Sequence, residues 1–168
     1  ALLDCEPESL GKMLYHSVEE PIAPVEFQGA PPCQEVVHLA TDPDFDLNRL
    51  VPAPTNTPID AGPFFCLGLV LASDPEDASL TDVTIHRLCV QERDELSMFL
   101  AAGRHIEVFR KKAEEAGKPL PVTINMGLDP AIYIGACFEA PTTPFGYNEL
   151  GVAGALRQTP VELVQGVA

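Results

Sequence analysis

The pattern of apolar and polar positions changes near residue 61. Prolines recur throughout residues 1–60, where no long apolar run appears, so we expect this part to wrap over other structure. From residue 61 onward, β-rich runs at 64–72 and 83–90 flank a polar, proline-containing connector, which predicts two paired strands and a hairpin loop. We therefore divide the chain into a proline-rich lead-in, 1–60, belonging to an incomplete N-terminal region, and a domain, 61–168, truncated at its C-terminal end.

The remaining periodicities predict the other elements. Apolar residues at helical spacing indicate helices, and short β-rich runs between turn signals indicate strands. Helices are expected at 9–18 with Ser9 as the cap, at 105–116 and at 148–157, and further strands at 95–100, 122–126, 131–138 and 161–167. Because strands and helices do not alternate regularly, we expect an α+β fold built on an antiparallel sheet or barrel, and not a doubly wound sheet.

Composition and charge narrow the classes of function. A hydrophobic fraction of 46% and a charged fraction of 21% are typical of a globular domain. The formal net charge of −15 disfavours nucleic acids and anionic membranes as partners. Apolar runs too short for a bilayer and the lack of a signal-peptide pattern predict a cytoplasmic protein. Five cysteines without a Cys-x-x-Cys pair indicate neither a disulfide framework nor a zinc ribbon.

Candidate chemistry begins in the predicted strand at 82–87. Alternation along a strand separates its side chains into two sets, with Asp82, Thr84 and His86 on one face and Val83, Ile85 and Arg87 on the other. An arginine on an apolar face needs a partner. From this segment alone, an edge-strand arginine that extends into solvent is favoured over a functional arginine.

Two further candidates lie where helices are expected to start. His105 follows Gly103 and Arg104, at a position where free backbone amides favour an anion and an imidazole could bind a metal. Glu149 lies in the first turn of the next helix, where acidic residues are common for electrostatic reasons alone. Each is more often an ordinary helix-start residue than a ligand.

Together with Asp82, these two residues would offer two carboxylates and one imidazole, a set suited to Mg²⁺ or Mn²⁺. Spacing alone does not bring the three together. The chain contains no Gly-x-Gly-x-x-Gly, phosphate-loop, Gly-x-Ser-x-Gly or His-Glu-x-x-His motif. Residue patterns therefore lead only as far as an α+β domain with an anion or metal site.

Five motifs occur in the same order as in a known family and with similar gaps. They are PAPTNT (52–57), DVTIHR (82–87), GRHI (103–106), GLDP (127–130) and AGALR (153–157). On these motifs the chain resembles the UbiD family of decarboxylases over nearly its whole length. Within that family, FEAPTTPFGYNEL (138–150) resembles the branch that acts on gallate and 3,4-dihydroxybenzoate (protocatechuate).

The resemblance implies a flavin-reductase-like, antiparallel split β-barrel with flanking helices that binds prenylated FMN and a divalent metal. The implied metal is Mn²⁺ or Mg²⁺, with K⁺ as a further candidate ion. The implied metal ligands are Asp82, His105 and Glu149, although the family usually has asparagine at the first of these positions. The positions implied to line the cofactor are Asp82, Val83, Thr84, Ile85, His86, Arg87, Arg104, His105 and Glu149.

The resemblance also implies an activity and an assembly. Arg87 matches the catalytic arginine of the family, whose planar fork can bind a substrate carboxylate. The implied reaction is non-oxidative decarboxylation of a hydroxylated aromatic acid in a homo-oligomer, with a flavin prenyltransferase supplying the cofactor. The family's proton-donating acid lies further along than Ala168, so we expect an internal fragment that is inactive alone. Two alternatives are a split-barrel flavin oxidoreductase and a non-catalytic truncated subunit.

Overall fold

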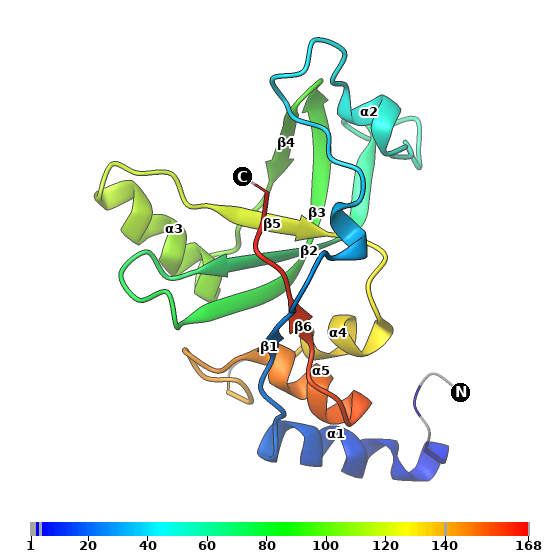
Figure 1. Cartoon of the computed structure of the whole chain (residues 1–168), viewed down its shortest axis with the longest axis vertical. Coiled ribbons are helices and arrows are strands. Elements are labelled where there is room, and N and C mark those ends of the chain that lie inside the picture. The colour runs from blue at the N-terminus through cyan, green and yellow to red at the C-terminus, as the bar shows by residue number, and fades with distance from the viewer. Residues whose placement is uncertain (1–2, 4, 140, 168) are drawn as a thin grey trace.

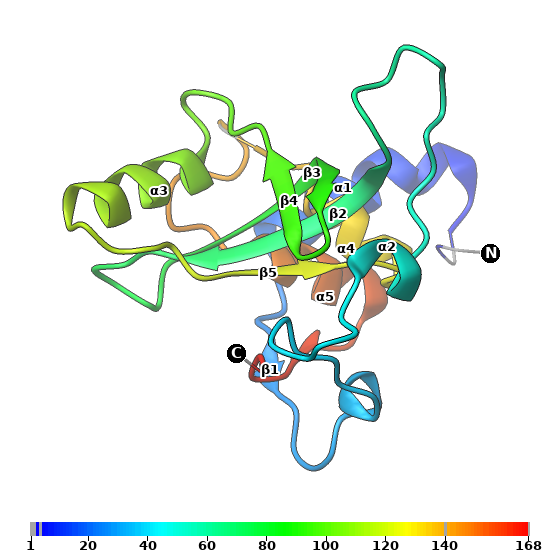
Figure 2. The ribbon, with the colours of Figure 1, turned by 90° about the horizontal axis from the view of Figure 1, so that it is seen from above.

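A four-stranded antiparallel sheet forms the centre of the computed structural model, which describes residues 3, 5–139 and 141–167 (Figure 1). The spatial order is β4-β3-β2-β5, made of β2 (Phe64–Ser73), β3 (Thr81–Glu92), β4 (Glu95–Met98) and β5 (Val122–Asn125). The sheet curls, and helices flank it on more than one side (Figure 2). These features confirm the predicted antiparallel core with flanking helices.

The two faces of the sheet bury different helices. On one face, Leu69 and Val83 pack with residues of α4 (Pro130–Gly135) and α5 (Glu149–Arg157). On the other face, the alternate residues Val70 and Ala72 pack with Ile106 and Phe109 of α3 (His105–Glu115). The apolar run at 69–72 follows from this arrangement, since this part of β2 is covered on both faces.

The pairing of β2 with β3 is interrupted near Arg87. Leu88 pairs with Phe65 and His86 pairs with Gly68, so Cys66 and Leu67 together lie opposite Arg87 alone. This two-against-one arrangement is a β-bulge, which bends the strand and redirects the side chains beside it. A Cβ on Gly68 would collide with the Leu88 side chain, which explains the glycine at the end of the bulge.

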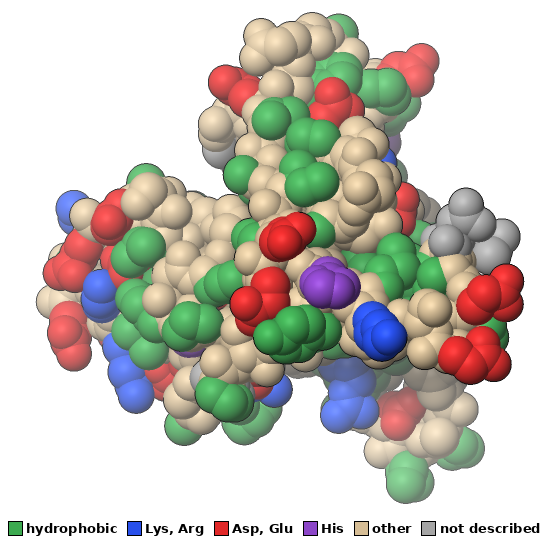
Figure 3. Space-filling view, turned by 90° about the horizontal axis from the view of Figure 1, so that it is seen from below, with side chains coloured by type: hydrophobic (Ala, Val, Ile, Leu, Met, Phe, Trp, Pro, Cys, Tyr) green, Lys and Arg blue, Asp and Glu red, His purple; other side chains and the backbone are tan. Residues whose placement is uncertain are grey.

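The first part of the lead-in packs on α5. Helix α1 (Leu10–Glu19) starts after the short 3-10 helix Pro7–Ser9, and Ser9 occupies its N-cap position without a side-chain cap hydrogen bond. The apolar side of α1 contacts the cluster around Val152 of α5. Its outer face belongs to a surface on which acidic, basic and apolar side chains are mixed (Figure 3). Between α1 and β2, the helices in the described part of the chain are the 3-10 helix Pro32–Gln34 and the single turn α2 (Leu47–Leu50).

A two-stranded parallel pair joins the lead-in to the last part of the chain. β1 (Val25–Glu26) pairs with β6 (Glu162–Leu163), and the Ile22 amide donates to the Gly151 carbonyl over 3.0 Å. The strand predicted at 161–167 is therefore reduced to two residues. A Cβ on Gly154 would collide with the Ile22 carbonyl oxygen, so the chain passes α5 too closely for any other residue there.

The strand predicted at 131–138 is wrong, because this segment contains α4. The Asp129 side chain accepts a hydrogen bond from the Ala131 amide over 2.8 Å, and Pro130 occupies the first turn. Both features favour a helix start. The β-branched and aromatic composition misled the prediction, since burial of Ala131 and Ile132 against neighbouring elements outweighs the local preference for a strand.

All five cysteines are free thiols, in agreement with the sequence analysis. Among the residues placed by the structure, no helix combines the length and the apolar character needed to cross a lipid bilayer.

Candidate metal and cofactor site

Three elements meet at one end of the sheet and bring three predicted ligands together. Asp82 is the second residue of β3, His105 is the first residue of α3 and Glu149 is the first residue of α5. Each offers one ligand atom, and these atoms all lie within 4.8 Å of one another. The two carboxylates are buried and the imidazole is partly exposed.

Hydrogen bonds hold the starts of the two helices that carry His105 and Glu149. Asp82 Oδ2 accepts a hydrogen bond from the Ile106 amide over 2.8 Å, which holds the first turn of α3 against β3. Asp82 Oδ1 lies 3.9 Å from Nδ1 of His105. Asn148 caps α5 by accepting from the Leu150 amide over 3.0 Å, so Glu149 falls in the first helical turn. The three ligands thus lie on regular secondary structure.

An aromatic side chain orients the imidazole. Phe145 contacts His105 edge to face, with ring centroids 5.2 Å apart, and contacts Phe109 in the same manner at 5.8 Å. Since Phe109 is fully buried, this stack connects the candidate ligand to the core of the domain. The loop between α4 and α5, which carries Phe145, therefore contributes to the site.

The charge of the site is not balanced by the described residues. Burial raises the pKa of Glu149 to about 7, and the nearby Asp82 carboxylate acts in the same direction. Burial likewise raises the pKa of Asp82, although the Ile106 amide and His105 oppose this effect. Glu149 Oε2 is buried, and no hydrogen-bond partner for it is found among the residues with assigned positions. Two buried carboxylates with an unused oxygen fit a divalent cation, which would supply the missing charge.

A cavity of about 30 Å³ lies at these residues. This volume holds one ion or water molecule, whereas a flavin needs a much larger space. The predicted residues that line it are Asp82, Val83, Thr84, Arg104, His105 and Glu149. Four lining residues that the sequence analysis had not assigned are Gly103, Phe138, Glu139 and Thr143.

The missed polar residues carried only a weak signal in the sequence. Thr143 is fully buried, and its hydroxyl has no partner in the portion of the chain that the structure covers. Glu139 forms an ion pair with Arg104 at the rim of the cavity, and both side chains are about half exposed. Both residues belong to the 138–150 run that indicated the family branch. That match identified the segment, but a lone threonine or glutamate in a loop has no motif that assigns it a role.

Three of the predicted cofactor-lining residues do not reach this cavity. Ile85 packs against the core on the α4 and α5 side of the sheet. His86 is partly exposed, and burial lowers the pKa of its imidazole. Arg87 is exposed at the bulge and forms no ion pair with any residue among 3, 5–139 and 141–167. β3 pairs with β4 over 88–92, so Arg87 lies where the described part of that edge of β3 is not paired, and its exposure fits the interpretation as an arginine that extends into solvent.

The family model for the UbiD 3-octaprenyl-4-hydroxybenzoate carboxy-lyase Rift-related domain matches residues 25–168. The chain belongs to the UbiD family. Among curated UbiD relatives, gallate decarboxylase of Lactiplantibacillus plantarum is 53% identical over 162 residues, which are 95% of this chain and 33% of the relative. The recognition from sequence motifs is thereby confirmed.

Solved UbiD structures agree with this assignment. The apo 3,4-dihydroxybenzoic acid decarboxylase of Klebsiella pneumoniae is 78% identical and superposes with a TM-score of 0.91 over 99% of this chain and 34% of its own. The UbiD-class enzyme HmfF of Pelotomaculum thermopropionicum, in complex with prFMN, is 34% identical with a TM-score of 0.83 over 95% of this chain and 36% of its own. The chain spans about a third of the length of these relatives.

Proposed function

We propose that this UbiD-family chain forms the metal- and cofactor-binding part of a non-oxidative decarboxylase for a hydroxylated aromatic acid of the gallate or 3,4-dihydroxybenzoate type. The observation that carries the proposal is the convergence of Asp82, His105 and Glu149, with ligand atoms within 4.8 Å of one another. The substrate class is supported by two relatives, a gallate decarboxylase and a 3,4-dihydroxybenzoic acid decarboxylase.

The proposed metal is Mn²⁺ or Mg²⁺. Two carboxylate oxygens and one imidazole nitrogen suit these ions, and a divalent charge would keep Asp82 and Glu149 ionised in spite of their burial. Thr143 offers a further oxygen at the cavity wall. We include K⁺ as a second candidate ion.

The proposed cofactor is prenylated FMN, held beside β3 and the start of α3. When bound, it would supply the electron sink that accepts the electron pair left by departing carbon dioxide. Arg104 lies at the rim of the cavity, where its guanidinium could bind a phosphate in place of Glu139. Arg87 stays charged at any working pH, so it could hold the substrate carboxylate before the bond to the ring breaks.

The chain needs contributions from outside itself in this proposal. No carboxylate forms an ion pair with Arg87 in the structurally described ranges, so the proton-donating acid would come from another part of the full protein. By itself the chain would be inactive. We further propose a cytoplasmic homo-oligomer that receives its cofactor from a flavin prenyltransferase.

The test measures metal binding and catalysis separately. Titration calorimetry with Mn²⁺ on this chain should show one site in the wild type and a loss of at least about 100-fold in affinity in His105→Ala and Glu149→Gln. Arg87→Ala should bind Mn²⁺ as the wild type does.

Decarboxylation of gallate and 3,4-dihydroxybenzoate is then measured in the full-length protein, co-expressed with a flavin prenyltransferase. Both Arg87→Ala and His105→Ala should abolish carbon dioxide release. Nicotinamide oxidation without carbon dioxide release would instead identify a flavin oxidoreductase. A protein that binds neither flavin nor metal would identify a non-catalytic subunit.

A further inference from the structure

Helix α3 carries the candidate ligand His105 at its first residue, so whatever holds the helix also positions the imidazole. Its apolar residues Ile106, Phe109 and Ala113 are buried against the sheet. The hydrophobic effect that buries these residues is non-directional, whereas polar contacts have preferred directions. Polar contacts at the ends of α3 can therefore add to the restraint that side-chain packing provides.

Two aspartates of the β2–β3 hairpin make such contacts, one near each end of α3. At the first turn, Asp82 accepts from the Ile106 amide over 2.8 Å. Near the last turn, Lys112 Nζ donates to Asp74 Oδ2 over 2.6 Å. The two aspartates lie close together on the hairpin, because Asp82 pairs with Ala72 and Asp74 follows directly after the end of β2.

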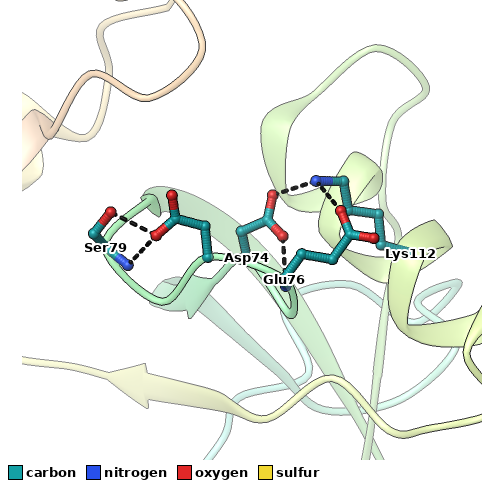
Figure 4. A network of polar contacts seen from close by, with 5 residues as sticks. Asp74, Glu76, Ser79 and Lys112 are labelled. Atoms are coloured by element: carbon teal, nitrogen blue, oxygen red, sulfur yellow. Dashed lines mark hydrogen bonds and ion pairs between the residues drawn. The ribbon is translucent and has the colours of Figure 1, made fainter.

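The second contact belongs to a network of polar contacts around the β2–β3 loop (Figure 4). Asp74 Oδ1 accepts from the Glu76 amide over 2.9 Å, and Lys112 Nζ also lies 3.0 Å from Glu76 Oε2. The Asp77 side chain in the same loop accepts from both the amide and the hydroxyl of Ser79. The Asp74 side chain is completely inaccessible to solvent. The lysine thus meets a loop whose shape is already fixed.

We propose that the Asp74–Lys112 ion pair positions the metal site, because it fixes the direction of α3 and so keeps His105 within coordinating distance of Asp82 and Glu149. At 1.5 Å per residue, Lys112 lies about 10 Å along the helix from His105. A tether at that distance limits pivoting about the Asp82 contact. Asp74 and Lys112 are positioning residues that touch neither metal nor cofactor. The inference rests on the proposed function, since it concerns the same metal site.

The test uses variants that remove the charge and keep the shape. Lys112→Met retains the aliphatic stem, and Asp74→Asn retains an oxygen for the Glu76 amide. Lys111→Met is the matched control, since Lys111 is exposed and pairs only with Glu107 of its own helix among the described residues. Lys112→Arg tests rescue by another cation.

We expect Lys112→Met and Asp74→Asn to weaken Mn²⁺ binding about tenfold in titration calorimetry, in the range seen for residues that orient metal ligands. Lys111→Met should stay within about twofold of the wild type, and Lys112→Arg should recover most of the affinity. Wild-type Mn²⁺ affinity in both charge-removing variants, measured where they are fully folded, would overturn the inference even if their melting temperatures fall.

A second measurement separates this inference from the proposed function. Hydrogen exchange of the Ile106 amide, compared with amides of β2, reports on the Asp82 contact without any metal. We expect about tenfold faster exchange at Ile106 alone in Lys112→Met. If wild-type protein binds no Mn²⁺, the proposed function fails, and unchanged Ile106 exchange would independently refute the positioning role.

Discussion

The β2–β3 hairpin contains two buried aspartates in opposite electrostatic environments. Burial acts to raise the pKa of Asp74, but the hydrogen bonds from Lys112 and from the Glu76 amide outweigh it, so the pKa lies below its ordinary value. At Asp82 burial prevails over the Ile106 amide and His105, so the pKa lies above its ordinary value. The same helix, α3, brings a cation to one aspartate and an imidazole to the other.

The opposite pKa shifts of Asp74 and Asp82 distinguish an ion pair that stabilises the fold from a site that is suited to binding a cation. Asp74 has a hydrogen bond to each oxygen and a cation from its own chain, so nothing further is required. Asp82 shares its surroundings with the buried Glu149, and no lysine or arginine forms an ion pair with either carboxylate among the residues described. Buried negative charge without an internal partner is costly, so this pair is suited to a cation from solution.

The largest expected effect is the pH dependence of the metal-free protein. Glu149 has a folded-state pKa of about 7 against 4.5 when unfolded, so its contribution to stability is fully present below about pH 4.5 and is lost as the pH rises through 7. As the pH is raised from 5 to 8, the free energy of unfolding of Glu149→Gln should therefore increase by roughly 2.5 kcal/mol relative to that of the wild type. Urea denaturation at several pH values measures this difference.

Addition of Mn²⁺ is the control for this measurement. Because the metal binds the ionised carboxylates, wild-type stability should then increase as the pH rises through 7. The opposite outcome is a difference in the free energy of unfolding between wild type and Glu149→Gln that stays constant with pH in metal-free buffer. It would show that the charge of Glu149 is already compensated within the protein.

The second largest effect is a loss of stability, whereas Glu149→Gln is expected to gain stability at high pH. Asp74→Ala leaves the Glu76 amide and the Lys112 ammonium without their buried acceptor, and we expect a loss of about 2 kcal/mol in the free energy of unfolding at pH 7. The depressed pKa of Asp74 means that its contribution is present above about pH 3.8 and is lost as the pH falls. Arg49→Gln, which removes an exposed ion pair with Asp46, is the control and should change stability little. Equal losses in both variants would contradict the distinction between buried and exposed pairs.

The smallest effect is expected for a substitution that changes the charge at the metal site but keeps the shape of the side chain. Asp82→Asn keeps an oxygen for the Ile106 amide but removes one negative charge, so the metal-free protein should become slightly more stable. Mn²⁺ affinity should fall about tenfold, since ligand charge strengthens binding of hard cations. Calorimetry on both proteins measures this difference, and unchanged affinity would mean that the negative charge of Asp82 does not strengthen Mn²⁺ binding.

Much of the fold followed from periodicity. The helices at 9–18, 105–116 and 148–157 and the strands at 64–72 and 83–90 are all present, with ends that differ by a few residues. The prediction of a strand at 131–138 failed because an apolar, β-branched run can be buried as a strand or as a helix. The capping residue Asp129 and the adjacent Pro130 are visible in the sequence as part of the GLDP motif.

The candidate site was predictable in its residues but not in its geometry. Asp82, His105 and Glu149 were identified through the family resemblance, and each alone had an ordinary explanation. Glu139, Thr143 and the Asp74–Lys112 pair were not identified, because their roles depend on contacts between distant segments.

The sequence by itself determined which segments form the main strands and helices, which family the chain resembles and which side chains could bind a metal. These properties depend on local preference, on alternation along each element and on motif order. Only the tertiary structure decided that one aspartate of a hairpin is neutralised by Lys112 while another is left beside Glu149 without a cation. Burial and charge pairing depend on the packing of segments far apart in the chain, and residue spacing does not specify that packing.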